Sequence, residues 1–184
     1  MNNEITNAVD VLKSGGIILY PTDTIWGIGC DACCDTAVKK VFEIKRRDHS
    51  KPLICLASSF EMVGEYVEVS NLKKLKSISE KSPTTFIFNN PTKISKYVSS
   101  NSYSIGFRVP NDNFCSELLI KFGRPIVSTS ANISGFDIPL EFNLISSEIK
   151  SKVDYVVNYG KNKRSYSAST ILKIDEKGLI TKLR

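Results

Sequence analysis

Three short polar segments of this chain carry hydroxyl groups and cations beside predicted buried strands. PTDT follows the apolar run IILY at residues 17–20, STSAN follows PIV at 125–127, and KRRDHSKP at 45–52 leads into LICLAS. In open α/β sheets the loops at strand ends line the ligand crevice, where hydroxyls and cations can hold an anion. The three segments therefore predict an anion-binding cradle. Three unrelated surface loops are the alternative, because the same residue types form turns.

A fourth segment, YSIGFRVP at residues 103–110, alternates apolar and polar residues with a period of two. Such a strand has one apolar face, and its other face carries Ser104, Gly106 and Arg108. Ser104 and Arg108 therefore point the same way, either into a binding site or into solvent. A single arginine on a solvent-exposed face is the commoner arrangement, so this strand alone does not assign a site.

Lys45 and Arg47 lie at the predicted end of a helix that begins at Asp35, its predicted N-cap. In a helix, two residues at this spacing point about 200° apart, whereas in an extended segment they share a side. Because the helix is predicted to end near Arg46, the extended geometry is available. Both cations are therefore candidates for one ligand.

These segments are positioned by helical and strand patterns that alternate along the chain and predict an α/β fold. The 184 residues contain no linker or repeat, which predicts one domain over residues 1–184. Helices are predicted at 5–12, 35–46, 59–66, 70–79 and 112–123, the last capped by Asp112 and stopped by Gly123. Strands are predicted at 17–20, 52–58, 84–88, 103–110, 125–127, 153–159, 168–174 and 179–184.

The net charge of +6 indicates an anionic partner, which could be a nucleotide, RNA or phosphate. No apolar run is long enough to span a membrane, and the polar N-terminus lacks a signal pattern, so a cytoplasmic location is expected. Of the five cysteines, Cys30 and Cys33 form a C-x-x-C pair, but there is no second pair and His49 is the single histidine. Ordinary reduced thiols are therefore expected rather than a metal or redox site.

Four motifs together, YPTDTIWGIGCDA, IKRRDHSKPLICLAS, SIGFRVP and PIVSTSANISG, resemble the YrdC/TsaC family of threonylcarbamoyl-AMP synthases in its single-domain form. The resemblance extends from about residue 5 to the C-terminus, and the combination of Lys-x-Arg at 45–47 with Ser-x-Asn at 130–132 is its most specific part. It implies a twisted, mixed, open α/β sheet with flanking helices around a basic cavity.

The resemblance also implies roles for individual residues. It places L-threonine against Thr22, Thr24, Arg108, Ser130 and Ser169. It places ATP against Lys45, Arg47, Lys51, Ser104, Asn132 and Arg184. Lys45, Arg47, Ser130 and Asn132 are its candidate catalytic residues, and Gly27 and Gly29 are expected to let the backbone approach the ligand.

The family reaction joins L-threonine, bicarbonate or CO2, and ATP into threonylcarbamoyl-AMP and pyrophosphate. The product supplies other proteins that transfer the threonylcarbamoyl group to tRNA, and the resemblance therefore implies these partners. Mg2+ is expected to accompany ATP, without assigned protein ligands. There is no P-loop motif, so the nucleotide must bind to a different cradle.

Some residues depart from the family pattern. Leu56 stands where many two-domain members have histidine, Leu140 replaces a small hydroxyl residue, and Trp26 stands where Tyr or Phe is common. Trp26 is equally well explained as an anchor in the core or as cavity lining.

Two other functions fit parts of the sequence. A non-catalytic module binding duplex RNA or tRNA would use the basic charge, but the polar loops hold few aromatic residues for base stacking. Weak RNA binding alongside catalysis is also compatible. A carbamoyl-transfer domain of the hydrogenase-maturation kind would share the fold but normally lies within a longer chain.

Overall fold

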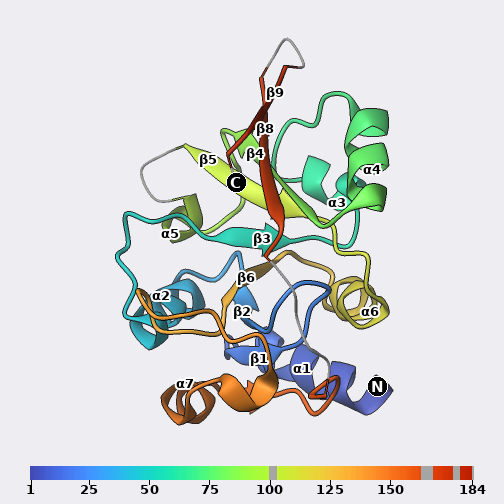
Figure 1. Cartoon of the computed structure of the whole chain (residues 1–184). Helices are drawn as coiled ribbons and strands as arrows, with labels where there is room; N and C mark the ends of the chain where they lie inside the picture. Colours follow the sequence, from blue (N-terminus) through green and yellow to red (C-terminus); the bar gives the residue numbers. More distant parts are fainter. Residues whose placement is uncertain (100–102, 163–167, 176–178, 184) are drawn as a thin grey trace.

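The structure is a computed structural model that describes residues 1–99, 103–162, 168–175 and 179–183 (Figure 1). Its described strands form one nine-stranded mixed sheet in the order β7-β1-β2-β6-β3-β5-β4-β8-β9. The strands are β1 Ile18–Tyr20, β2 Gly27–Asp31, β3 Ile54–Leu56, β4 Thr84–Asn89, β5 Ser104–Arg108, β6 Ile126–Ser130, β7 Tyr155–Val156, β8 Thr170–Ile174 and β9 Ile180–Lys182. The helices are α1 Asn2–Lys13, α2 Asp35–Lys45, α3 Phe60–Gly64, α4 Leu72–Lys81, α5 Lys96–Ser99, α6 Asn113–Phe122 and α7 Ser147–Lys152, with a 3-10 turn η1 at Phe142–Leu144.

Strand directions bring the three polar segments to one edge of the sheet. β2 is antiparallel to both β1 and β6, so β1 and β6 run the same way and end at the same edge. β3 is antiparallel to β6 and therefore begins at that edge. The segments after Tyr20, after Ser130 and before Ile54 are consequently neighbours, as the sequence predicts.

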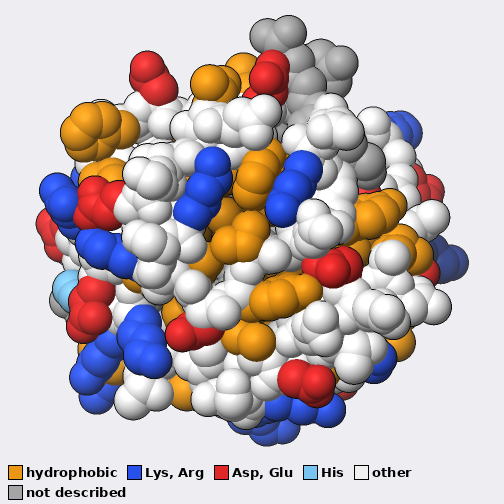
Figure 2. All heavy atoms as spheres, turned by 90° about the horizontal axis from the view of Figure 1, so that it is seen from below, with side chains coloured by type: hydrophobic (Ala, Val, Ile, Leu, Met, Phe, Trp, Pro, Cys, Tyr) orange, Lys and Arg blue, Asp and Glu red, His pale blue; other side chains and the backbone are white. Residues whose placement is uncertain are grey.

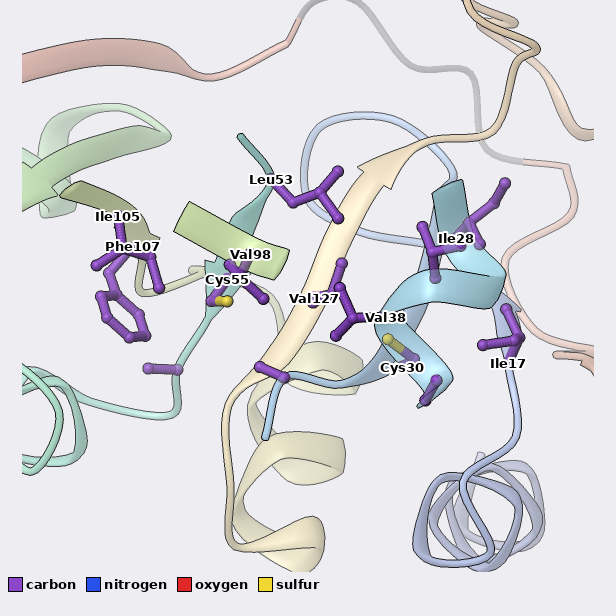
Figure 3. Close-up of a cluster of buried hydrophobic side chains, with 14 of the residues drawn as sticks. Ile17, Ile28, Cys30, Val38, Leu53, Cys55, Val98, Ile105, Phe107 and Val127 are labelled. Atoms are coloured by element: carbon purple, nitrogen blue, oxygen red, sulfur yellow. The ribbon is translucent and has the colours of Figure 1, made fainter. Parts of the chain in front are cut away.

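The two faces of the sheet bury two different sets of apolar side chains, because successive strand residues point to opposite faces. On one face, residues such as Leu19, Ile28 and Val127 pack beneath α2 and α5 (Figure 1). Figure 3 shows part of this cluster, including Cys30 and Cys55. On the other face, α1 and α6 pack against a second cluster that includes Ile18, Tyr20, Leu56 and Ile126.

Helix ends follow the sequence signals in α6 and at the C-terminal end of α2, which is predicted near Arg46, but not at the N-terminal end of α2. The Asp112 carboxylate accepts a hydrogen bond from the Cys115 backbone N–H at 3.0 Å, and Gly123 has a φ of 77°, which confirms the predicted start and stop. Asp35 as an N-cap is wrong, because it is the first residue of α2 and Cys34 occupies the cap without a side-chain hydrogen bond. At the other end, Arg46 adopts a left-handed conformation with a φ of 48°, which turns the chain out of α2.

The segment containing Gly27 and Gly29 is a strand, β2, for which the sequence patterns predicted no element. A Cβ atom at Gly29 would lie 2.7 Å from Cε1 of Tyr20 and 2.9 Å from the backbone oxygen of Val127. Gly29 is therefore needed for packing between β1 and β6. Gly27 does line the cavity described below. The elements α5, η1 and α7 were not predicted either.

Candidate functional site

A cavity of about 200 Å³ lies where the three polar segments meet. Its lining comes from the β1–β2 loop and the first residue of β2, from the segment before β3 and the first residue of β3, from β5, from β6 and the loop after it, and from β8 and the residues just before it. The lining residues are Thr22, Thr24, Ile25, Gly27, Arg47, Pro52, Leu53, Ile54, Arg108, Ser128, Thr129, Ser130, Ile138, Ala168, Ser169 and Ile171. Arg47 and Arg108 are the charged members of this lining, so the cavity is suited to anionic groups.

The β1–β2 loop is held in shape by the hydroxyl group of Thr22. Thr22 Oγ1 donates to the backbone oxygen of Ile25 at 2.8 Å and accepts from the backbone N–H of Thr24 at 3.1 Å. The two threonine hydroxyl oxygens are 2.9 Å apart. Both side chains therefore stand on a preformed turn at the cavity wall, where their hydroxyls can bind a polar ligand.

Arg108 is buried in the wall, with 2% of its side chain exposed. Its Nη1 forms an ion pair with Oδ1 of Asp23, a residue that the sequence reading did not assign to the site. The Nε–H of Arg108 is buried and has no hydrogen-bond partner among the described residues. Buried donors are normally paired, so this N–H is a candidate donor to a ligand or a water molecule.

Arg47 approaches the cavity from the segment between α2 and β3. Its Nη2 donates to the backbone oxygen of Pro52 at 2.9 Å, and its Nε donates to that of Lys51 at 3.3 Å. Partial burial lowers the pKa of the Arg47 guanidinium, which nevertheless remains a cation at neutral pH. The group is thus fixed by backbone contacts and keeps its charge for an anion.

Lys45 does not line the cavity, although the sequence reading paired it with Arg47. Its side chain is 1% exposed, and its ammonium group donates to the backbone oxygen of Ser130, to that of Asn132 at 2.7 Å, and to Asn132 Oδ1 at 3.3 Å. Burial, followed by the charge of Arg47, lowers the pKa of Lys45 to about 7. The turn at Arg46 sends Lys45 into the interior and Arg47 to the cavity. An ATP contact by Lys45 therefore stays a prediction.

The loop after β6 is internally hydrogen-bonded. Ser130 Oγ donates to Asn132 Oδ1 at 2.5 Å, and Asn132 Nδ2 donates to the backbone oxygen of Phe136 at 2.6 Å. The backbone N–H of Ser134 donates to the Lys45 backbone oxygen at 2.8 Å. Ser130 lines the cavity, whereas Asn132 lines a second hollow on the other side of the loop, beside Arg46 and Phe136.

Further hydroxyl groups complete the cavity. Ser169 lies at its wall and shares a 2.8 Å hydrogen bond with Thr85. Ser128 and Thr129 also line it but were missed, because the predicted strand ended at Val127. If the predicted strand had been extended to Ser130, the alternation that puts Ser104 and Arg108 on one face would also have put Ser128 and Ser130 on one face.

Other predicted residues lie elsewhere or remain untested. Lys51 is exposed, and neither Lys51 nor Ser104 is part of the cavity lining. Arg184 lies outside the described residues. Leu56 belongs to the core under α1 and α6. Trp26 is 2% exposed and its ring centroid lies 4.8 Å from that of Phe142, so it is a core anchor rather than cavity lining.

Cys30, Cys55 and Cys115 are buried, whereas Cys33 and Cys34 are partly exposed. Burial raises the pKa of Cys33 to about 11 and the pKa values of Cys30, Cys55 and Cys115 well above the usual range, which keeps these thiols protonated. Within the described part of the chain, no group of three or more His, Cys, Asp or Glu side chains could hold a metal ion. His49 stacks on Phe42 with ring centroids 4.5 Å apart.

The mixed α/β sheet carries a hydroxyl-lined cavity with two arginines in its wall, which suits small anionic molecules. The chain belongs to the Sua5/YciO/YrdC family, whose profile, described as "Telomere recombination", matches residues 10–184. A threonylcarbamoyl-AMP synthase of Psychromonas ingrahamii is 33% identical over 153 residues, which cover 81% of this chain and 80% of that protein. A putative threonylcarbamoyl-AMP synthase of Methanocaldococcus jannaschii is 38% identical over 172 residues, covering 92% and 80% respectively.

Solved structures confirm the fold. E. coli YciO superimposes with a TM-score of 0.83 at 22% identity, covering 100% of this chain and 89% of that one. Sua5 from P. abyssi in complex with L-threonine superimposes with a TM-score of 0.86 at 24% identity. The match covers 98% of this chain, which spans about half (53%) of the Sua5 chain. The predicted α/β class and the twisted, mixed, open sheet are therefore correct.

Proposed function

We propose that this protein is a threonylcarbamoyl-AMP synthase that joins L-threonine, bicarbonate or CO2, and ATP. The observation that carries the proposal is the cavity, which holds Arg108 and the Thr22–Thr24 hydroxyls together with Arg47 and Ser130. The names of the relatives in Psychromonas ingrahamii and Methanocaldococcus jannaschii support it. Transfer of the adenylyl group makes the enzyme a nucleotidyltransferase.

The residues suit a reaction that needs positioning rather than a side-chain nucleophile. The threonine amine first combines with bicarbonate to form a carbamate, with loss of water. The carbamate oxygen then attacks the α-phosphorus of ATP, a P–O bond forms, and the bond to the leaving pyrophosphate breaks. Holding both reactants in one small cavity supplies the effective concentration for this step.

Each cation has a distinct part in this proposal. Arg108 binds the carboxylate of threonine, and Thr22, Thr24, Ser130 and Ser169 hold the polar groups of the amino acid. Arg47 stabilises the charge that develops on the phosphate, as fixed donors in a partly dry site do well. Asn132, Lys51, Ser104 and Arg184 remain proposed nucleotide contacts. Mg2+ bound to ATP would supply charge neutralisation on the phosphates.

Pyrophosphate release from ATP tests the proposal directly. We expect release to require both L-threonine and bicarbonate, with omission of either lowering it to the background rate. L-Serine serves as the amino-acid control because it lacks only the methyl group. Pyrophosphate release that is independent of threonine, or absent with all three substrates present, would contradict the proposed function.

We further propose that the product passes to tRNA threonylcarbamoyl-transfer proteins in the cytoplasm. No helix in the described residues has both the length and the apolar character needed to cross a bilayer.

On the face of the molecule in Figure 2, basic side chains are interspersed with acidic ones. This mixture favours weak, salt-sensitive RNA binding. RNA binding that is sequence-selective at physiological salt, without turnover, would instead support the non-catalytic module.

A further inference from the structure

Asp23 lies between two threonines that line the cavity, yet its own side chain reaches Arg108 instead. Its Oδ1 accepts from Nη1 of Arg108, and its Oδ2 accepts from the backbone N–H of Asn111 at 3.3 Å. Asp23 thus joins the β1–β2 loop to the end of β5 and to the segment that leads into α6. The carboxylate is 10% exposed and is not part of the cavity lining.

The burial of Arg108 explains why a carboxylate is needed there. An arginine whose side chain is 2% exposed has lost most of its hydration, and a buried cation without a partner is strongly destabilising. Asp23 supplies the missing negative charge from within the chain. The contact also restricts the rotation of a long side chain that would otherwise adopt several rotamers.

The guanidinium group is only partly used by this contact. It carries five N–H donors in one plane, and a carboxylate binds best to two adjacent donors. Asp23 takes Nη1, whereas the buried Nε–H has no partner in the described residues. Arg108 also lines the cavity, so the edge of the guanidinium that carries Nε, which Asp23 does not use, is left for another acceptor.

We propose that Asp23 is a positioning residue that fixes Arg108 so that its Nε side receives the carboxylate of the amino-acid substrate. The proposal rests on the proposed function in taking an amino acid as the substrate. Asp23 acts through Arg108 and does not touch the substrate itself.

The local sequence explains how one loop serves both purposes. The hydrogen bonds of Thr22 to Ile25 and Thr24 fix the turn, so adjacent side chains must leave it in different directions. Thr22 and Thr24 reach the cavity while Asp23 turns toward Arg108. The thiol of Cys115 in α6 lies 3.5 Å from the backbone oxygen of Pro21, which adds a further contact behind the loop.

Steady-state kinetics of Asp23→Ala and Asp23→Asn test the proposal, with L-threonine and ATP varied separately. We expect Asp23→Ala to raise the KM for L-threonine by about 10-fold or more while the KM for ATP changes by less than about 2-fold. Asp23→Asn keeps an acceptor oxygen of the same shape and should show a smaller rise. If Asp23→Ala does not fold, the Asp23→Asn variant is used for the same kinetic test.

The matched control is Asp31→Asn, which removes the charge of another buried aspartate. Asp31 is 6% exposed and forms an ion pair with Arg124 at 2.8 Å, away from the cavity lining. This variant should lose thermal stability without a change in either KM. If Asp31→Asn shifts the KM for L-threonine as Asp23→Asn does, the effect at Asp23 is general destabilisation and the proposal is wrong.

A double-mutant cycle separates positioning from direct contact. If Asp23 acts through Arg108, Asp23→Ala should have little further effect on kcat/KM for L-threonine in an Arg108→Ala background. Independent effects that multiply would contradict the proposal. A folded Asp23→Ala protein with an unchanged KM for L-threonine would also contradict the proposal. A lower KM would contradict it as well, because Asp23 would then compete with the substrate carboxylate.

The failure of the proposed function can be distinguished from the failure of this inference. Wild-type protein is first heated with and without L-threonine, and an increase in Tm reports binding without turnover. If L-threonine raises the Tm of the wild type and not that of Asp23→Ala, the positioning role holds even where pyrophosphate release is absent. If the wild type neither releases pyrophosphate nor gains Tm with L-threonine, both proposals are wrong.

Discussion

The ammonium group of Lys45 lies 2.7 Å from the backbone oxygen of Asn132, a residue 87 positions later in the chain. The same group also donates to Asn132 Oδ1 and to the backbone oxygen of Ser130. One buried lysine at the end of α2 thereby fixes the loop that follows β6. Because Ser130 lines the cavity, the shape of the candidate site depends on a side chain that does not enter it.

Replacing Lys45 by methionine should therefore loosen this loop as well as weaken ATP use. Two backbone oxygens would lose a charged donor, and unsatisfied buried polar groups cost about 1–3 kcal/mol each. We expect a Tm lowered by several degrees and a kcat/KM for ATP at least about 10-fold lower. The control is Lys40→Met on the exposed side of α2. A Lys45→Met protein with wild-type Tm but no ATP use would show that Lys45 serves the nucleotide directly.

The stability provided by Lys45 should depend on pH in a defined direction. Burial and the charge of Arg47 lower the pKa of Lys45 to about 7, whereas a lysine in an unfolded chain has a pKa of about 10.4. Between these values the unfolded chain binds more protons, so the free energy of unfolding should rise with pH. Above about pH 9 the cysteines, whose folded pKa values are raised, oppose this trend in both proteins.

The measurement is the free energy of unfolding in urea at pH 7 and at pH 9.5, for the wild type and for Lys45→Met. Taking the difference between the two proteins removes the contribution of the cysteines, which they share. We expect the advantage of the wild type over the variant to grow at the higher pH. An advantage that stays constant or shrinks would mean that Lys45 keeps an ordinary pKa in the folded protein.

Gly29→Ala should destabilise the fold because β2 has no room for a methyl group. The added Cβ would lie 2.7 Å from Tyr20 Cε1 and 2.9 Å from the Val127 backbone oxygen, so β1 or β6 must shift. We expect a loss of about 1–3 kcal/mol in the free energy of unfolding. Gly64→Ala is the control, since nothing lies within 4 Å of its Cβ and alanine favours the helix. Equal stability of the two variants would contradict the close packing.

The candidate site could be predicted from the sequence where the alternation of apolar and polar residues along a strand determines to which face each side chain points. The period of two in β5 put Arg108 on the face that carries the cavity, and the polar segments beside β1, β3 and β6 met at one edge of the sheet. Both results follow from strand geometry, which depends on neighbouring residues. The resemblance to a known family then indicated which ligand such a cavity could bind.

Contacts between distant residues could not be predicted in the same way. The left-handed turn at Arg46 separates Lys45 from Arg47, and no local pattern indicates that Lys45 reaches the Ser130–Asn132 loop. The ion pair of Asp23 with Arg108 likewise joins residues 85 positions apart. The close packing around Gly29 could not be predicted either, because glycine serves both turns and tightly packed strands.

The final prediction separates the two arginines of the cavity by substrate. Arg47→Ala should mainly raise the KM for ATP or lower kcat, because Arg47 is proposed to face the phosphates. Arg108→Ala should mainly impair the use of L-threonine. Loss of a charge-assisted contact in a partly dry cavity costs about 2–4 kcal/mol of transition-state stabilisation, whereas a solvated surface charge contributes little.

Their effects on stability should differ as well. Arg108→Ala leaves the largely buried carboxylate of Asp23 without its counter-charge, which costs about 3–5 kcal/mol, whereas the Arg47 guanidinium donates to the backbone oxygens of Lys51 and Pro52. The variants are therefore compared by kinetics with each substrate varied and by thermal unfolding. Because Arg108→Ala is the variant at risk of misfolding, the double variant Asp23→Asn/Arg108→Gln, which is neutral and similar in shape, provides a folded alternative. If folded variants at both positions keep near-wild-type kcat/KM for both substrates, the two arginines are not part of an active site.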